Sequence, residues 1–354
     1  MIRFTWLQAR TQTAVLFGAL AIIAIATVIT GPHLVHLYNA NIASCTAHGN
    51  CDAATATFLR NDRTLRLWLG ILVIVVPGII GIFWGAPLVA RELESGTYRL
   101  AWTQSVTRTR WLAVKLAVVG AISMAVTGLL SLIVTWWASP LDTVNANRLS
   151  PSMFDQRGVV AVGYVAFAFA LGVTAGVVTR RTLPAMAVTL VGFTVVRVAV
   201  IHWIRPRFIA PLHRIVALDA MPMGFGSSNS GAMTLHPDPP NIPGAWIYST
   251  RIVDRAGHAF TSAELQRTCP NIGATLRPPP APIAGNGVRS EVTVGAKDAL
   301  RECVAKVGTK FHAVVTYQPA KNYWALQWFE LALFLTAALV LCGVCFWWVR
   351  RRLA

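Results

Sequence analysis

Acidic residues are scarce in this sequence, and so is charge of either sign. Only 14 of the 354 residues are Asp or Glu, and charged residues together make up 13% of the chain. Soluble domains carry about 25% charged residues. The shortage excludes an ordinary soluble enzyme, and the 55% share of hydrophobic residues agrees with that exclusion.

Several motifs that carry chemistry are also missing. No G-x-x-x-x-G-K-[ST] occurs, so the chain has no P-loop with which to bind ATP. H-E-x-x-H, G-x-S-x-G and G-x-G-x-x-G are absent too, and the eight histidines form no cluster with metal-ligand spacing. We therefore predict no catalytic residue, no metal site and no cofactor in this chain, which by itself is not an enzyme.

Basic residues are plentiful by comparison. The 31 Lys and Arg residues give a net charge of +17, which is typical either of nucleic-acid binding or of a membrane protein with basic loops. Long apolar stretches decide between the two, because each has about the 20 residues that a bilayer-spanning helix needs. They cover residues 13–30, 67–89, 112–138, 158–178, 183–204 and 325–349. We predict an all-α polytopic membrane protein with six transmembrane helices, a lipid bilayer as its surroundings and no nucleic acid as a partner.

The first apolar stretch could also be a cleaved signal peptide, since Arg3 and Arg10 precede it. Its apolar run is long for a signal peptide, and residues 31–33 offer no small-x-small cleavage site. We therefore favour an uncleaved helix. Residues 1–12 then form either a short helix at the cytoplasmic interface or a frayed terminus.

The distribution of basic residues predicts the orientation. Short cytoplasmic loops carry an excess of Lys and Arg. With the N-terminus inside, the inside segments hold Arg3, Arg10, Arg91, Arg99, Arg108, Arg110, Lys115, Arg180, Arg181, Arg350, Arg351 and Arg352. Arg60, Arg63 and Arg66 before the second helix weaken this assignment without reversing it. We predict a multi-pass protein of the cell membrane with both termini in the cytoplasm.

The six cysteines fit this topology. Cys45 and Cys51 fall in the first outside loop, and Cys269 and Cys303 fall in the large outside segment. Disulfides require an oxidising compartment, so we predict Cys45–Cys51 and Cys269–Cys303 bonds, with free thiols as the alternative. Cys342 and Cys345 spell C-x-x-C inside the last apolar stretch, where we expect small packing residues rather than a redox or metal site.

Residues 205–323 form the one segment that is large enough for a folded subdomain outside the membrane. Residues 245–253 alternate as a strand does, and 311–317 read as a second strand. Thr261 to Glu264 is a capping box that opens a short helix reaching Cys269, and 298–307 predicts another helix carrying Cys303. We predict a small α+β insert between helices five and six. Topology does not explain its basic excess, which fits a solvated surface or contact with anionic headgroups or envelope polymers.

Two ionisable residues lie inside the predicted helices, Arg197 in the fifth and Glu330 in the sixth. Each is about 9 Å deep, counted inward from Trp203 or Trp324 at 1.5 Å per residue. Both lie at one level, so an intramembrane ion pair is one prediction. The alternative is that each side chain reaches the outer interface separately.

The loop after the second helix combines several unusual features. It begins with the acidic residues Glu92 and Glu94, continues with Gly96 and Thr97, and then becomes basic from Arg99 onward. Composition alone predicts a charged helix that stops at residues 95–96, followed by a solvated basic loop. The pattern, together with six helices, an N-terminal interfacial segment and a large external insert, resembles the ABC-2-type export permeases, and within them the actinobacterial-type subunits. The insert is longer than is common in that family.

The resemblance implies a permease subunit that lacks its own ATPase. A coupling loop at 90–111 would dock on a separate ABC ATPase subunit, which would bind ATP and Mg, and two permease copies would form a homodimer or heterodimer. The coupling residues would be Glu92, Glu94, Gly96, Thr97 and Arg99. The substrate path would follow helices two and five, where Pro77, Gly78, Gly81, Gly85 and Pro184 are either bend points or small packing residues.

The sequence thus predicts four parts. Residues 1–12 are the interfacial segment, 13–204 the first five helices, 205–323 the extracytoplasmic subdomain, and 324–354 the last helix with a basic cytoplasmic tail. An alternative function is a non-transporting membrane sensor or assembly scaffold that works through the insert. A transporter driven by an ion gradient is disfavoured, because no acidic residue lies at mid-membrane. The substrate itself is not readable from the sequence.

Overall fold

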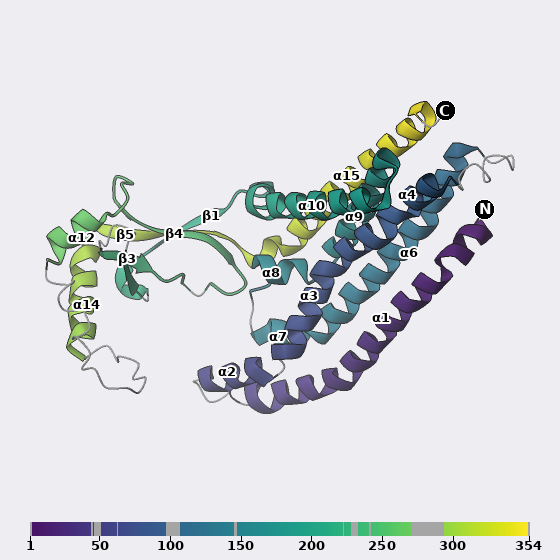
Figure 1. The fold of residues 1–354 in the computed structure, drawn as a ribbon. Helices are drawn as coiled ribbons and strands as arrows, with labels where there is room; N and C mark the ends of the chain where they lie inside the picture. The colour runs from purple at the N-terminus through teal and green to yellow at the C-terminus, as the bar shows by residue number, and fades with distance from the viewer. Residues whose placement is uncertain are drawn as a thin grey trace, which may run out of the picture. The chain divides into compact units, whose positions relative to one another are not determined.

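The protein is described by a computed structural model that divides into two compact units. The first comprises Met1–Ile209 and Lys321–Ala354, and the second comprises Ala210–Ala320. Figure 1 shows the fold of the chain. The structure describes residues 2–43, 45, 51–61, 63–96, 107–144, 147–221, 223–227, 233–240, 242–270 and 294–352.

The first unit is helical. Its α-helices are α1 (Ile2–Tyr38), α2 (Asp52–Asn61), α3 (Arg63–Ile80), α4 (Ala86–Ser95), α6 (Arg108–Trp137), α7 (Ser139–Val144), α8 (Pro151–Asp155), α9 (Val160–Thr179), α10 (Thr182–Ala199), α11 (Arg205–Phe208) and α15 (Tyr323–Arg352). Three π-helical turns continue them, η1 (Asn39–Ala43), η3 (Gly81–Gly85) and η4 (Val200–Ile204). Among the described residues, six helical segments are long and apolar enough to cross a membrane, which confirms the predicted fold class.

The short connections differ from the loops that the sequence predicts. α2, α7 and α8 are helices in segments expected to be irregular. At the N-terminus, residues 2–12 belong to α1, which runs without a break into the first span instead of forming a separate interfacial helix. Hydropathy marks only the apolar windows, so it does not detect short polar helices beside them.

Helix α9 lies at the centre of the first unit, and α3, α4, α6, α10 and α15 all pack against it (Figure 1). Of its apolar window, 78% is buried, against 17% for the window in α1. Its glycines allow this close packing: a Cβ at Gly176 would lie 2.6 Å from the carbonyl oxygen of Ala86. Small residues that let helix backbones approach are typical of membrane helix interfaces.

The second span is interrupted by the π-turn η3. Pro77 lies four residues before its first residue, Gly81, and proline removes a backbone donor and clashes with the preceding turn. Gly81 and Gly85 then pack directly on α9, where added Cβ atoms would lie 2.6 Å and 2.7 Å from the carbonyl oxygens of Ala168 and Phe169. Gly81 and Gly85 are therefore close-packing residues, and they are also the first and last residues of the irregular turn η3.

The second unit is a small α+β fold. Strands β1 (Leu212–Val216), β5 (Phe311–Gln318) and β4 (Trp246–Asp254) form an antiparallel sheet in the order β1-β5-β4. β2 (Met223–Ser227) and β3 (Met233–Pro237) form a separate antiparallel pair. The helices are α12 (Ser262–Thr268) and α14 (Val294–Gly308). The predicted strands at 245–253 and 311–317 and both predicted helices are present, whereas β1, β2 and β3 were not predicted.

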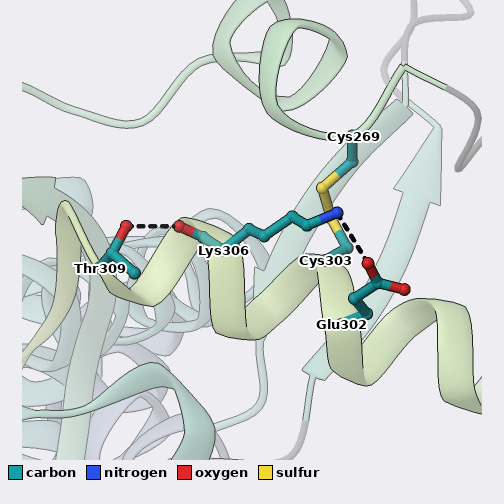
Figure 2. The surroundings of a disulfide bond; sticks show 5 residues. All are labelled: Cys269, Glu302, Cys303, Lys306 and Thr309. Carbon is teal, nitrogen blue, oxygen red and sulfur yellow. Dashed lines mark hydrogen bonds and ion pairs between the residues drawn. A yellow bond between two sulfur atoms is a disulfide. The ribbon is translucent and has the colours of Figure 1, made fainter.

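The disulfide between Cys269 and Cys303 joins the end of α12 to the middle of α14 (Figure 2). α12 begins with the predicted capping box, in which Thr261 and Glu264 each accept a hydrogen bond from the other's backbone. In the first unit Cys45 is bonded to Cys51. Both disulfides therefore have the pairing that the compartment argument predicts.

Candidate functional site

The second span ends as the charge pattern predicts. α4 stops at Ser95, and Gly96 caps it with a φ of 73°. Glycine occupies this left-handed region without the steric cost that a Cβ carries, so the chain can leave the helix abruptly there. Thr97 and Arg99, the other members of the predicted coupling set, lie outside the described residues.

Both acids near the end of α4 have partners within the chain. Glu92 forms an ion pair with Lys115 of α6, and the Lys115 side chain is buried and also reaches the carbonyl oxygen of Leu88 at 3.4 Å. Glu94 accepts hydrogen bonds from the backbone N–H of Thr182 at 3.1 Å and from its hydroxyl at 2.7 Å. Thr182 is the first residue of α10, where a carboxylate satisfies free N–H groups and the positive helix end. The end of the second span is thereby tied to the start of the third and of the fifth.

A buried cluster of ionisable residues lies near the other end of α10, where Arg197 is in the last turn. We call it the ion-pair cluster: Asp155 of α8, Tyr164 of α9, Arg197 of α10, Arg205 of α11 and Glu330 of α15. Arg205 and Glu330 have no exposed surface, and Asp155 and Arg197 are 3% and 7% exposed. Burying a charge in such surroundings is costly unless it is paired and hydrogen-bonded.

Arg205 is at the centre of the ion-pair cluster. Its Nε lies 2.7 Å from Oε2 of Glu330, and its Nη2 lies 2.9 Å from Oε1 of Glu330 and 2.5 Å from Oδ1 of Asp155. Nη2 of Arg197 donates to Oδ2 of Asp155 at 2.8 Å. The Tyr164 hydroxyl lies 2.6 Å from Oε1 of Glu330 and 3.0 Å from Oδ1 of Asp155.

The predicted direct pair of Arg197 and Glu330 is not what the structure gives. Both residues belong to the ion-pair cluster, but Arg197 pairs with Asp155 and Glu330 pairs with Arg205. Asp155 and Arg205 were assigned to external segments, because each lies just outside an apolar window. The available signal was that each stands within a few residues of a predicted helix end, where a short helix can turn it back into the bundle.

The ion-pair cluster contains more donors than acceptors. Every carboxylate oxygen of Asp155 and Glu330 accepts at least one hydrogen bond. In contrast, Nη1 of Arg197 and Nη1 of Arg205 are buried and have no hydrogen-bond partner among the described residues. Arginine has five N–H donors and no acceptor, so these two Nη1 groups can be satisfied only by an additional acceptor.

Gln327 of α15 holds the turn that carries Asp155. Its Oε1 accepts from the backbone N–H groups of Val159 and Val160 at 3.1 Å and 3.0 Å. Its Nε2 donates to the carbonyl oxygens of Phe154 and Arg157, each at 3.1 Å. A single buried amide thus satisfies both the end of α8 and the start of α9. The sequence analysis missed Gln327, because a lone amide in an apolar helix has no motif around it.

A cavity of about 540 Å³ opens beside the ion-pair cluster, between α3 with η3 and α10 with η4. Its lining is mostly aliphatic and comes from the second and fifth spans and from α8: Ile74, Val75, Gly78, Ile79, Ile82, Pro151, Ser152, Asp155, Leu190, Phe193, Thr194, Arg197, Val198 and Ile201. The volume falls within the range of about 300–1,000 Å³ that is usual for small-molecule sites. Most of the cavity lining is apolar, and Asp155 and Arg197 are its charged residues.

The comparison with protein families supplies the identity. A family model described as ABC-2 membrane transporter related matches residues 17–205, which is more than half of the chain. The chain belongs to the ABC-2 membrane transporter related family. No curated protein and no solved structure matches it. Together with the six apolar helices, the family makes the chain a multi-pass membrane protein and a permease-type component of an ABC transporter.

The family match covers most of the permease features described above. It includes α4, α6 and α10 with the contacts of Glu92 and Glu94, and it includes every segment that lines the cavity. It also includes four of the five residues of the ion-pair cluster, namely Asp155, Tyr164, Arg197 and Arg205. It leaves out the second unit and α15, which contributes Glu330 and Gln327. The cluster therefore joins the family-matched part of the permease to a helix beyond it.

A second ion-pair group lies in the permease outside the spans. Oδ2 of Asp142 is 3.5 Å from Nε of both Arg148 and Arg157. Burial raises the pKa of the Asp142 carboxyl above its usual value, and the two arginines oppose that rise. Burial also lowers the pKa of Arg157. Among the described residues no group of three or more His, Cys, Asp or Glu is placed to hold a metal ion.

Proposed function

We propose that the chain is the transmembrane permease subunit of an ATP-driven exporter. A separate ABC ATPase subunit binds and hydrolyses ATP with Mg, and two permease copies form the translocation unit. The permease lies in the cell membrane with both termini in the cytoplasm. The observation that supports this proposal is the pair of contacts at the end of the second span, Glu92 with Lys115 and Glu94 with Thr182.

The ties give a route by which movement of the coupling segment reaches the membrane helices. The segment from residue 97 follows directly on Gly96, so a displacement of that segment pulls on the end of α4. Through Lys115 and Thr182 the same displacement acts on α6 and α10. In this proposal Glu92 and Glu94 transmit movement within the permease, and the contacts with the ATPase are left to other residues of 90–111.

The cavity supports a substrate path along the second and fifth spans. Binding of ATP by the partner changes the relative stability of two permease states, and the path opens to one side or the other. The irregular turns η3 and η4 are the candidate bend points in these spans. Pro184 is not one of them, because it lies in the first turn of α10, where proline is tolerated.

Site-specific photo-cross-linking tests the proposal. A photo-reactive amino acid replaces Arg91, which is exposed near the end of α4, or Arg63, which is exposed at the start of α3 at the other end of the same span. After illumination of native membranes, position 91 is expected to capture a subunit that binds ATP, and position 63 is not. Capture of an ATP-binding subunit is read out with a labelled azido-nucleotide.

The Glu94→Gln variant adds a functional readout. The ATPase should still be captured at position 91, whereas substrate-stimulated ATP hydrolysis by the reconstituted complex should fall, because the tie to Thr182 is weakened. Absence of any ATP-binding protein from the position-91 adducts would overturn the permease proposal. In that case the function would be the alternative, a membrane sensor or scaffold that works through its second unit.

A further inference from the structure

The cavity and the ion-pair cluster together define a binding site with a chemical preference. We infer that the cavity between α3 and α10 takes a single-chain amphipathic molecule with an acidic head group. The head group binds the guanidinium of Arg197, which lines the cavity, and the apolar chain lies along the aliphatic walls. The inference rests on the proposed function in one respect, since it names the class of substrate that the permease would carry.

The hydrogen bonds of the cluster favour an acceptor over a donor. Arg197 lines the cavity, its side chain is only 8% exposed, and its Nη1 is buried without a partner among the described residues. The carboxylate of Asp155, which also lines the cavity, already accepts from Arg197, Arg205 and Tyr164. A cationic group entering here would meet the positive charge of Arg197 and carboxylate oxygens that each already accept a hydrogen bond, whereas a carboxylate or phosphate oxygen gains a charge-assisted contact with the guanidinium.

The charges of the site allow one more anion. Within the ion-pair cluster two arginines balance two carboxylates, so the cluster has no excess negative charge to repel an acid. The buried surroundings strengthen an ion–guanidinium contact compared with the same contact in water. Ser152 and Thr194 also line the cavity and bring two hydroxyl-bearing side chains to it.

The remaining walls select for an apolar chain. Most lining residues are Ile, Val, Leu and Phe, and Gly78 keeps the space open beside Phe193, whose ring would lie 3.2 Å from a Cβ at that position. A small inorganic anion would leave these walls uncovered. An uncharged lipid could offer Arg197 only a neutral acceptor, which makes a weaker hydrogen bond than a charged one. An acidic amphipathic molecule covers the apolar walls with its chain and binds Arg197 with its acidic group.

The test measures binding by the purified full chain in a neutral maltoside detergent, without any ATPase. Three probes with the same twelve-carbon chain are compared: dodecanoate, its methyl ester and dodecylamine. Dodecanoate is expected to bind about 10- to 100-fold more tightly than the methyl ester, because the ester offers only a neutral acceptor in place of the charged carboxylate. Dodecylamine is expected to bind no more tightly than the ester.

Two matched variants identify the cavity while leaving the cluster intact. Val198 lines the cavity and Val195 lies one turn earlier on α10, outside the lining, and both are partly exposed. Val198→Trp is expected to weaken dodecanoate binding at least tenfold, and Val195→Trp is expected to leave it unchanged. Arg197→Lys keeps the positive charge but loses the second arm of the fork, so it should reduce the preference for dodecanoate over the ester.

Specific outcomes overturn the inference. Equal binding of dodecanoate and its ester would show that Arg197 does not select an acid. Equal effects of the Val195 and Val198 substitutions would place the bound chain elsewhere on the bundle, and a change of oligomeric state in Val198→Trp alone would show that a second copy covers the cavity. Since no ATPase is present, failure here leaves the cross-linking result intact, and failure of the cross-linking leaves selective binding intact.

Discussion

Arg205 shows how strongly single residues depend on their partners in this protein. Its guanidinium has no exposed surface and contacts Glu330 and Asp155 at once, while lying 4.3 Å from the ring centre of Phe154. A buried ion pair adds little over a well-packed apolar pair, but removing one partner leaves a charge without compensation. The ion-pair cluster is therefore more sensitive to substitution of one member than its net neutrality suggests.

Glu330→Gln should be strongly destabilising for this reason. It keeps the shape of the side chain, removes the negative charge and leaves Arg205 with Asp155 alone, so we expect a loss of about 3–5 kcal/mol in the free energy of unfolding. Thermal unfolding of the full chain in lipid nanodiscs measures the effect. Glu302→Gln is the matched control, because Glu302 and its partner Lys306 are 69% and 59% exposed. An equal shift for both variants would contradict the prediction.

Asp254 makes the stability of the fold depend on pH, in the direction that is usual for a carboxylate. Its pKa is lowered by hydrogen bonds, first from the His258 ring and then from the His258 and Ala256 backbone N–H groups. A carboxylate with a lowered pKa stabilises the fold above its unfolded pKa, about 3.9, and loses that effect as the pH falls through the folded value.

We therefore expect Asp254→Asn to lower the unfolding temperature of the full chain at neutral pH. The difference from the unsubstituted protein should shrink below about pH 4. Thermal scans at a series of pH values measure it. A difference that grows as the pH falls would contradict the assigned sign.

The residues of the ion-pair cluster were predictable only in part. Arg197 and Glu330 stand out because they interrupt apolar runs, but their common depth predicted a direct pair, whereas each pairs with a different residue of the cluster. Asp155 and Arg205 do not stand out, because a charged residue beside an apolar run is the ordinary pattern of a loop. Their burial results from α8 and α11, which are too short for periodicity to indicate. The charged residues could be identified from the sequence, but the tertiary contacts that pair them could not.

At the scale of elements, the contact between η3 and α9 determines how closely the second and fourth spans approach. Gly172 of α9 lies against the backbone of Gly81 and Gly85, and Gly176, one turn later, lies against the backbone of Ala86 at the start of α4. The sequence offered Gly81 and Gly85 as bend points or packing residues without deciding. The structure assigns both roles because the π-turn and the helix contact coincide.

Gly172→Ala tests this contact. Its methyl group would meet the carbonyl oxygen of Gly81 and lie 2.7 Å from the backbone nitrogen of Ala86, and neither backbone can move cheaply. We expect a loss of about 1–3 kcal/mol in stability from overpacking. Gly343→Ala in α15 is the control, because nothing lies within 4 Å of a Cβ there and alanine favours a helix by up to about 1 kcal/mol. Thermal unfolding that ranks the two variants the other way would refute this contact.

At the scale of the whole molecule, the chain is two units with separate cores. The second unit packs Leu265, Val304, Val307, Phe311 and Val315 around the Cys269–Cys303 disulfide. The predicted strand at 245–253 was recognised by its alternation, whereas β2 and β3 lie in a segment rich in Gly, Pro and Met, and β1 is only five residues long. Strand pairing between residues as distant as Leu212 and Tyr317 depends on the complete sheet, so local sequence could not indicate it.

Loss of the Cys269–Cys303 bond should affect the second unit alone. The cysteines are 34 residues apart, and closing a loop of that length accounts for about 3–4 kcal/mol in the chain-entropy estimate. We expect Cys269→Ser with Cys303→Ser to speed protease cleavage within 210–320 and to leave the helical unit resistant. Cys342→Ser in α15 is the control. Faster cleavage throughout the chain would show that the two units do not unfold separately.

The way the chain enters and leaves the second unit has a consequence for how such a protein can diversify. On the helical side, Arg205 is bonded to Glu330 and the rings of Phe208 and Phe329 stack at 6.0 Å. On the other side, the first and last strands of the unit are paired neighbours. The two chain connections of the second unit are thus held by these contacts, and none of them involves the residues between β1 and β5. We therefore expect that the segment between these connections can change in length and surface during evolution while the ends of the membrane helices stay the same.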